Sequence, residues 1–147
     1  MDEFVGPNWF QWTDEMLEMA SRVRERLEDR HLIVPEDPEQ RFPRKMPRPD
    51  PKAVIDADPT ESVASEEILD RLVELMPSAD VVHLGGIVYH VALSGILTNF
   101  TERDDRLLEE LLVFDGELAE RGLSVMAAAT YQKPSGPEAG KPSASHP

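Results

Sequence analysis

The histidines are the first residues to consider for chemistry, because the chain has four of them and no cysteine. On a helix, His83 and His90 lie two turns apart, roughly 10 Å, which is too far for both to bind one metal ion. In a hairpin around the Gly-Gly pair between them, they do not face each other. Glu28 and His31 have the Glu-x-x-His spacing of di-iron bundles, but that site needs a second copy. The sequence therefore predicts no metal site, and we expect hydrogen-bonded structural histidines.

No catalytic motif is recognisable elsewhere in the chain. The serines lack the Gly-x-Ser-x-Gly elbow, and Gly85-Gly86 lacks the spacing and the lysine of a phosphate-binding loop. Pairs of carboxylates carry no information in a chain with 29 acidic residues. We therefore expect no catalytic residue and no cofactor. One alternative retains chemistry, because an apolar pocket beside Tyr89 and His90 would make the chain a small-molecule-binding protein or an enzyme.

Two groups of residues are typical of protein contacts. The first twelve residues hold four of the nine aromatic side chains, and such side chains are enriched in binding interfaces. The second group is a basic segment in which four arginines or lysines lie between residues 41 and 48. Each group has an alternative role, since aromatics can cover the chain's own core and a basic segment can lie against its own acidic helices. We predict these protein-binding residues: Phe4, Trp9, Phe10, Arg41, Arg44, Lys45 and Arg48.

Composition limits the class of protein. At 147 residues the chain has room for one domain. It lacks cysteine and an N-terminal run built like a signal peptide, so we expect a cytoplasmic protein or part of an intracellularly assembled particle. The formal net charge of −14 argues against direct binding to nucleic acid and suits a basic protein partner, or merely solubility. The apolar segment 79–100 contains polar residues and lacks basic flanks, so we expect no membrane contact.

The elements that must position these residues are mostly helical. Thr13 is a good N-cap and predicts a helix from Asp14 to about His31. Seven prolines within 35–59 exclude a helix or a central strand there and predict an extended strap. The predicted regions are an aromatic N-terminal arm (1–12), a first helix (13–34), the Pro-rich basic strap (35–59), a helical core (60–131) and a disordered tail (132–147).

The core is predicted within residues 60–131. Apolar residues from Ile68 to Met76 form one face of a helix that Pro77 ends. The segment 79–100 is apolar on every side, and we favour a buried central helix within it, over about 81–97. A further helix is predicted from Thr101, with Asp104 completing its capping box and Gly122 at its end.

A β-hairpin over 81–91 is the alternative, because β-branched residues flank the Gly-Gly pair; 123–131 would then be a strand of the same sheet, giving an α+β fold. We predict the mainly α fold: a small irregular bundle of three to four helices around a buried central apolar helix, with a strap and a tail. The function that this organisation favours is a non-enzymatic adaptor or structural subunit of a larger assembly, such as a particle component or an accessory subunit, which binds other proteins or copies of itself. An acidic regulator or immunity-type protein that masks a basic surface is the second alternative.

Overall fold

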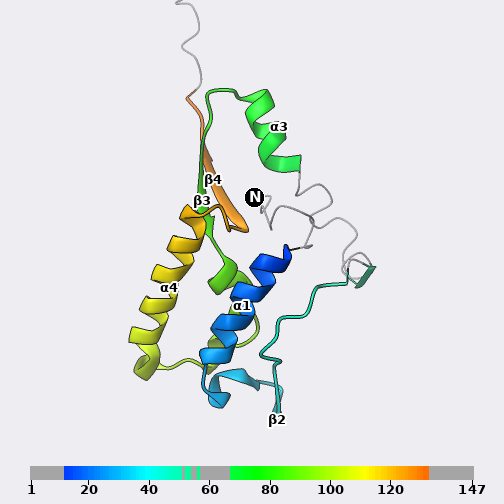
Figure 1. Ribbon diagram of the computed structural model, residues 1–147, viewed down its shortest axis with the longest axis vertical. Helices are drawn as coiled ribbons and strands as arrows, with labels where there is room; N and C mark the ends of the chain where they lie inside the picture. The colour runs from blue at the N-terminus through cyan, green and yellow to red at the C-terminus, as the bar shows by residue number, and fades with distance from the viewer. Residues whose placement is uncertain (1–11, 51, 54–55, 57–66, 133–147) are drawn as a thin grey trace, which may run out of the picture.

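The computed structural model describes residues 12–50, 52–53, 56 and 67–132 of the chain (Figure 1). Helices and strands follow in the order α1 (Asp14–Arg26), η1 (Asp29–Leu32), β1 (Ile33–Val34), β2 (Asp37–Arg41), α3 (Ile68–Leu75), β3 (Asp80–Gly85), η3 (Ile87–Ala92), η4 (Leu97–Asn99), η5 (Glu102–Asp104), α4 (Asp105–Glu120) and β4 (Met126–Thr130). The η elements are 3-10 helices, except that η3 is a π-helix. Both α1 and α4 pack against η3, so the π-helix lies at the centre of the described fold.

The architecture is mixed α/β, and the predicted mainly α bundle is wrong. About 53% of the described residues are helical and 17% lie in strands. The strands form two antiparallel pairs, β1 with β2 and β3 with β4. The α+β alternative fits better, and β4 lies within its predicted strand 123–131. Its hairpin over 81–91 is not formed, because β3 pairs across the fold with β4, placing Val82 opposite Ala128.

Helix α1 begins where the sequence predicts. The hydroxyl of Thr13 accepts a hydrogen bond from the backbone N–H of Met16 at 3.2 Å, which caps the helix. The helix ends at Arg26, earlier than the predicted end at His31, because Leu27 is extended with φ −75° and ψ 148°. The buried apolar residues of this region are Met16, Leu17, Ala20, Val23 and Leu27.

The centre of the core is the segment that follows β3. Ile87, Val88, Val91 and Ile96 are completely buried, as the apolar character of this segment predicts. The predicted continuous helix over 81–97 is wrong, however. Residues 81–85 are a strand, and Gly85 and Gly86 have φ values of +86° and +98°, which end the strand and turn the chain into the π-helix.

One buried carboxylate fixes the start of the π-helix. Asp115 of α4 accepts hydrogen bonds from the backbone N–H groups of Gly86 (2.9 Å), Val88 (3.0 Å) and Tyr89 (3.4 Å). The first N–H groups of a helix lack partners within it, and a carboxylate satisfies them favourably. A Cβ atom at Gly86 would lie 2.7 Å from Cγ2 of Val125, so this turn also requires glycine for space.

Strands β3 and β4 form a narrow ribbon that extends away from α1 and α4, and α3 lies at its far end (Figure 1). A bulge separates His83 from Gly85 in the register. At the base of the ribbon, the Ser124 hydroxyl accepts a hydrogen bond from the Gly85 N–H at 2.9 Å. No residue of α3 is buried, so the apolar face predicted for 68–76 is not part of the core.

Helix α4 follows the predicted capping box. The side chains and backbones of Thr101 and Asp104 exchange the two expected hydrogen bonds around η5. The helix then runs to Glu120, and Gly122 follows with φ +81°, as expected of a residue that ends a helix. Its buried residues, Asp115 and Leu118, face η3 and the base of the ribbon.

Some predictions fall outside the described residues. The aromatic arm with Phe4, Trp9 and Phe10 and the predicted disordered tail beyond Gln132 are not described, and these stay predictions. Within residues 12–50 and 67–132, no helix combines the length and the apolar character needed to cross a membrane.

Candidate interaction surface

The strap lies along α1, and Arg44 holds its first half there. The Arg44 guanidinium donates to the backbone oxygens of Arg24 (2.8 Å) and Leu27 (2.9 Å), and it forms an ion pair with Asp29. The last carbonyl groups of a helix have no partner within it, and a cation there is favoured by the helix dipole. Arg44 therefore caps the C-terminal end of α1.

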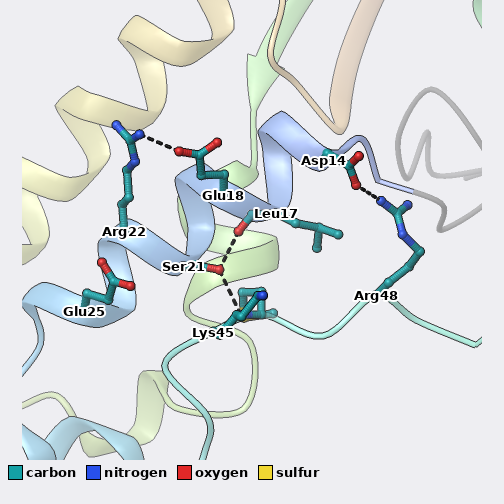
Figure 2. Close-up of a pocket in the computed structure, with 9 residues that line it drawn as sticks. Asp14, Leu17, Glu18, Ser21, Arg22, Glu25, Lys45 and Arg48 are labelled. Atoms are coloured by element: carbon teal, nitrogen blue, oxygen red, sulfur yellow. Dashed lines mark hydrogen bonds and ion pairs between the residues drawn. The ribbon is translucent and has the colours of Figure 1, made fainter.

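Arg48 attaches the strap to the other end of α1. Its guanidinium donates to the backbone oxygen of Trp12 at 2.6 Å and forms an ion pair with Asp14. Between the two arginines, the backbone N–H of Met46 donates to the Ser21 hydroxyl at 2.9 Å. The strap is therefore attached to α1 at both ends and in the middle. Figure 2 shows the contacts of Arg48 and Ser21.

An open cleft of about 680 Å³ lies between α1 and the strap, and Figure 2 shows the residues that line it. Its charged groups are mostly paired, Glu18 with Arg22 and Asp14 with Arg48. Of the predicted contact residues, Lys45 lines this cleft and is exposed. Arg41 lies elsewhere, on β2, and bonds to nearby backbone oxygens. The structure brings Arg44, Lys45 and Arg48 to one helix, and their role in binding a partner stays a prediction.

Arg24 is the most deeply buried cation of the described chain, with 2% of its surface exposed. Its guanidinium donates to three backbone oxygens, those of Ala92 (2.7 Å), Ser94 (2.9 Å) and Pro43 (3.0 Å). The group also lies 5.7 Å from the centre of the Phe42 ring. Burial lowers the pKa of Arg24 from its usual value. This side chain joins α1, the strap and the segment after η3.

A second buried cluster contains a histidine and a carboxylate, the pair of groups used for acid–base catalysis. His31 is completely buried, stacks on Phe100 and has its Nε2 atom 3.1 Å from Asp104. Hydrogen bonds from Arg30, and next from Thr101, hold the pKa of Asp104 far below its usual range. Because both members are closed off from solvent, the pair ties η1 to η5 and offers no position for a substrate.

Three clefts lie along α1, beside η1 and η5, and between β3 and α4, and neither Tyr89 nor His90 lines any of these three. The predicted pocket beside Tyr89 and His90 stays a prediction. Tyr89 is half exposed, with its backbone N–H on Asp115. Among the described residues, no group of three or more carboxylates or histidines is placed to hold a metal ion.

Large apolar side chains are exposed on α3, β3 and α4. Leu75 is 79% exposed, Val113 is 65% exposed and Leu84 is 57% exposed. We call the following set the apolar surface: Val73 and Leu75 of α3 with Met76 after it, Val82 and Leu84 of β3, and Leu112 and Val113 of α4. These seven are most of the ten exposed large apolar residues, and two of the three elements that carry them, β3 and α4, contact each other.

The same elements are strongly acidic. Helices α3 and α4 and strands β3 and β4 together carry nine carboxylates and two arginines. One of the carboxylates, Asp115, is buried, and the others are exposed. A surface that combines exposed apolar side chains with one sign of charge selects for partners of the opposite charge.

The apolar surface is the candidate interaction feature that sequence reasoning missed. The helical spacing of Ile68 to Met76 indicated an apolar face, but not that it lies outside the core. Val82 and Leu84 were predicted to be buried. Comparison of the chain with protein-family models, with curated proteins and with solved structures gave no match.

Proposed function

We propose that this chain is a non-enzymatic adaptor or structural subunit of a larger protein assembly. The observation that supports the proposal is the apolar surface on α3, β3 and α4. Isolated exposed apolar residues are ordinary, but a concentration of them on neighbouring elements is typical of a protein contact.

The free energy available from burying these side chains is comparable with the cost of association. Complete burial of one large aliphatic side chain contributes roughly 1.5–3 kcal/mol, and the side chains of the apolar surface are about half exposed or more in most cases. The exposed parts of the seven side chains amount to about four complete side chains, so burying them gives on the order of 6–12 kcal/mol. Association itself costs about 4–15 kcal/mol. The surface therefore supports a specific complex when hydrogen bonds or charge pairs add to it.

The shape of this region also favours a partner. A two-stranded ribbon is only marginally stable in water unless a further strand or a packed helix supports it. Here α3 contributes no buried residue at the far end of the ribbon. Helix α4 packs against β3, and a bound protein would supply packing for the far end of the ribbon and for α3.

One observation supports the acidic-regulator alternative as well, because nine carboxylates against two arginines on these four elements suit a basic surface. The two functions differ in what the contact depends on. An assembly contact depends on the apolar side chains, whereas charge masking depends on the carboxylates and weakens steeply as salt screens them.

The test is capture of the tagged full-length chain from its native cell, with the retained partner quantified by mass spectrometry. Val73→Thr with Leu75→Gln removes apolar character from two exposed positions of α3, so folding should be unchanged, and we expect at least a fivefold loss of the partner. Glu109→Gln is the matched control on α4. The proposal is wrong if the wild-type chain retains no stoichiometric partner, or if the double variant retains it as well as the control does.

A further inference from the structure

Strand β3 has a free edge. The sheet contains only β3 and β4 among the described residues. Apart from its pairing with β4, the backbone from Val81 to Leu84 takes part in no hydrogen bond with any described residue. In an antiparallel pair, alternate residues direct their N–H and C=O groups to the outer side. Half of these backbone groups are therefore available to another strand.

A cleft of about 580 Å³ runs along this edge. Four consecutive residues of β3, Val81 to Leu84, line it together with Gly116, Ala119 and Glu120 of α4. Successive strand residues point to opposite faces, so a cleft lined by four in a row follows the edge of the strand and not one face. The cleft is therefore in the position that a third strand would occupy.

Helix α4 leaves room for side chains at this place. A Cβ atom added at Gly116 would have no atom within 4 Å, and Ala119 lies one turn further along the same side of the helix. Leu112 lies one turn before Gly116 and is 55% exposed. On its α4 side the cleft is therefore lined by two small residues, Gly116 and Ala119, and by Glu120.

We propose that the edge of β3 binds an extended, basic segment of a partner protein as a third strand. The inference rests on the proposed function and names the mode of binding for it. Backbone hydrogen bonds to β3 hold the segment, and its alternate apolar side chains contact Gly116 and Ala119. Val82 and Leu84 of β3 supply cross-strand neighbours on the new strand.

The charges select the occupant. Glu120 lines the cleft, and Asp80 lies at the start of β3. The four elements α3, α4, β3 and β4 together carry nine carboxylates and two arginines. Lysine or arginine at the outward positions of the bound segment complements this field. A second copy of the chain brings the same carboxylates and a net charge of −14, so edge-to-edge pairing of β3 with β3 is repelled.

The probe is a short labelled peptide of alternating lysine and valine, titrated with the full-length chain by fluorescence anisotropy. We expect saturable binding that an otherwise identical glutamate–valine peptide lacks. Two further peptides carry N-methyl groups on every second residue, one in each of the two registers. Strand addition uses the N–H groups of one register only, so we expect one methylated peptide to lose at least about tenfold in affinity while the other binds as before.

A pair of variants locates the peptide on the molecule. Gly116→Leu fills the cleft, and because the added Cβ meets nothing in the free protein, the variant should fold normally. We expect it to weaken the lysine–valine peptide at least about tenfold. Glu110→Leu adds the same side chain on the other flank of α4. Glu110→Gln removes the same charge without adding leucine, and we expect these two variants to bind the peptide equally well.

The outcomes separate this inference from the proposed function. Strand addition at β3 is wrong if both methylated peptides lose affinity equally, or if Gly116→Leu binds the lysine–valine peptide fully. Equal binding of the glutamate–valine peptide also overturns it, and so does a dimer of the free chain that Gly116→Leu disrupts. If the native partner is captured and stays bound to Gly116→Leu, the proposed function stands and only the binding mode is wrong. If no native partner is captured, the peptide measurements still decide whether the edge binds a strand.

Discussion

Arg24 offers the sharpest test of how the described fold is held together. Its guanidinium donates to the backbone oxygens of Ala92, Ser94 and Pro43 and lies over the Phe42 ring. Arg24→Met keeps most of the side-chain volume and its apolar stem but removes all of these donors. Three carbonyl groups then lose a charged partner, two of them in the segment that follows the π-helix.

Two opposing effects set the magnitude. Each hydrogen bond to a charged group contributes roughly 1.5–3 kcal/mol, so the three bonds together contribute at least about 4.5 kcal/mol. The variant also removes the cost of burying a cation with no carboxylate beside it. This gain reduces the loss of stability by about 1–2 kcal/mol. Burial lowers the pKa of Arg24, which agrees in direction with a cost of burying the charge. The net loss of stability is therefore about 3 kcal/mol, a large part of the roughly 5–15 kcal/mol of a typical domain.

Urea unfolding followed by tryptophan fluorescence measures this loss, since Trp12 is buried beside α1. Arg22→Met is the control on the same helix. Arg22 is exposed and pairs only with Glu18, so we expect its variant to change stability by no more than about 0.5 kcal/mol. Equal stability of the two variants would refute the reasoning, because it would mean that the three carbonyl groups are satisfied equally well by water.

Three further predictions concern other parts of the fold. Asp115→Ala leaves the buried N–H groups at the start of the π-helix without an acceptor, and we expect a loss of about 2–4 kcal/mol in thermal unfolding; an unchanged melting temperature would contradict the assigned cap. Gly116→Ala should stabilise the chain by about 0.5–1 kcal/mol, since the added methyl group meets no other atom. Gly86→Ala should destabilise it, because Gly86 has φ +98° and the added Cβ would lie 2.7 Å from Cγ2 of Val125. Urea titration checks both variants. The pKa of Asp104 lies far below its usual range, so its ionised form stabilises the fold above about pH 4, and this contribution falls as the pH decreases towards the folded-state pKa. The difference in melting temperature between the wild type and Asp104→Asn should therefore shrink between pH 6 and pH 3, and a constant difference would contradict this.

Local signals in the sequence identified the beginnings of helices correctly. Thr13 at the start of α1 and the Thr101–Asp104 capping box act through atoms within one turn, so their effect can be read from the nearest residues. Gly122 ends the last helix as predicted. Such features do not depend on what the rest of the chain does.

The fold class was not predictable in the same way, because the ambiguous segment 81–97 is decided by contacts from far along the chain. β3 is a strand because β4 pairs with it, and the π-helix begins where it does because Asp115 caps it. Both partners come from residues after 114. Periodicity describes one segment alone and contains no information on these pairings.

The apolar surface could be predicted only in part. Helical spacing identified an apolar face over Ile68 to Met76, but the same spacing is expected for a core helix and for an interface helix. Whether that face is buried depends on the position of α3 relative to the core, which is set by the ribbon that follows it in the chain. The basic strap, in contrast, could be interpreted either as a partner contact or as a segment lying on its own helix, and the structure places Arg44 and Arg48 against α1.

The attachment of the strap has a consequence for the order in which the chain folds during synthesis. Arg24 bonds to oxygens 68 and 70 residues further along the chain, whereas Arg44 and Arg48 contact α1 from 17 to 36 residues away. At roughly 5–20 residues per second, a ribosome needs about 4–14 s to make the chain from Arg24 to Ser94, just after the π-helix. Helix formation takes microseconds, but a helix of 13 residues is only marginally stable alone, so α1 lacks its main packing partner throughout this time. The strap arrives first, and we expect it to cover part of the helix and protect its apolar residues from other nascent chains until the core closes.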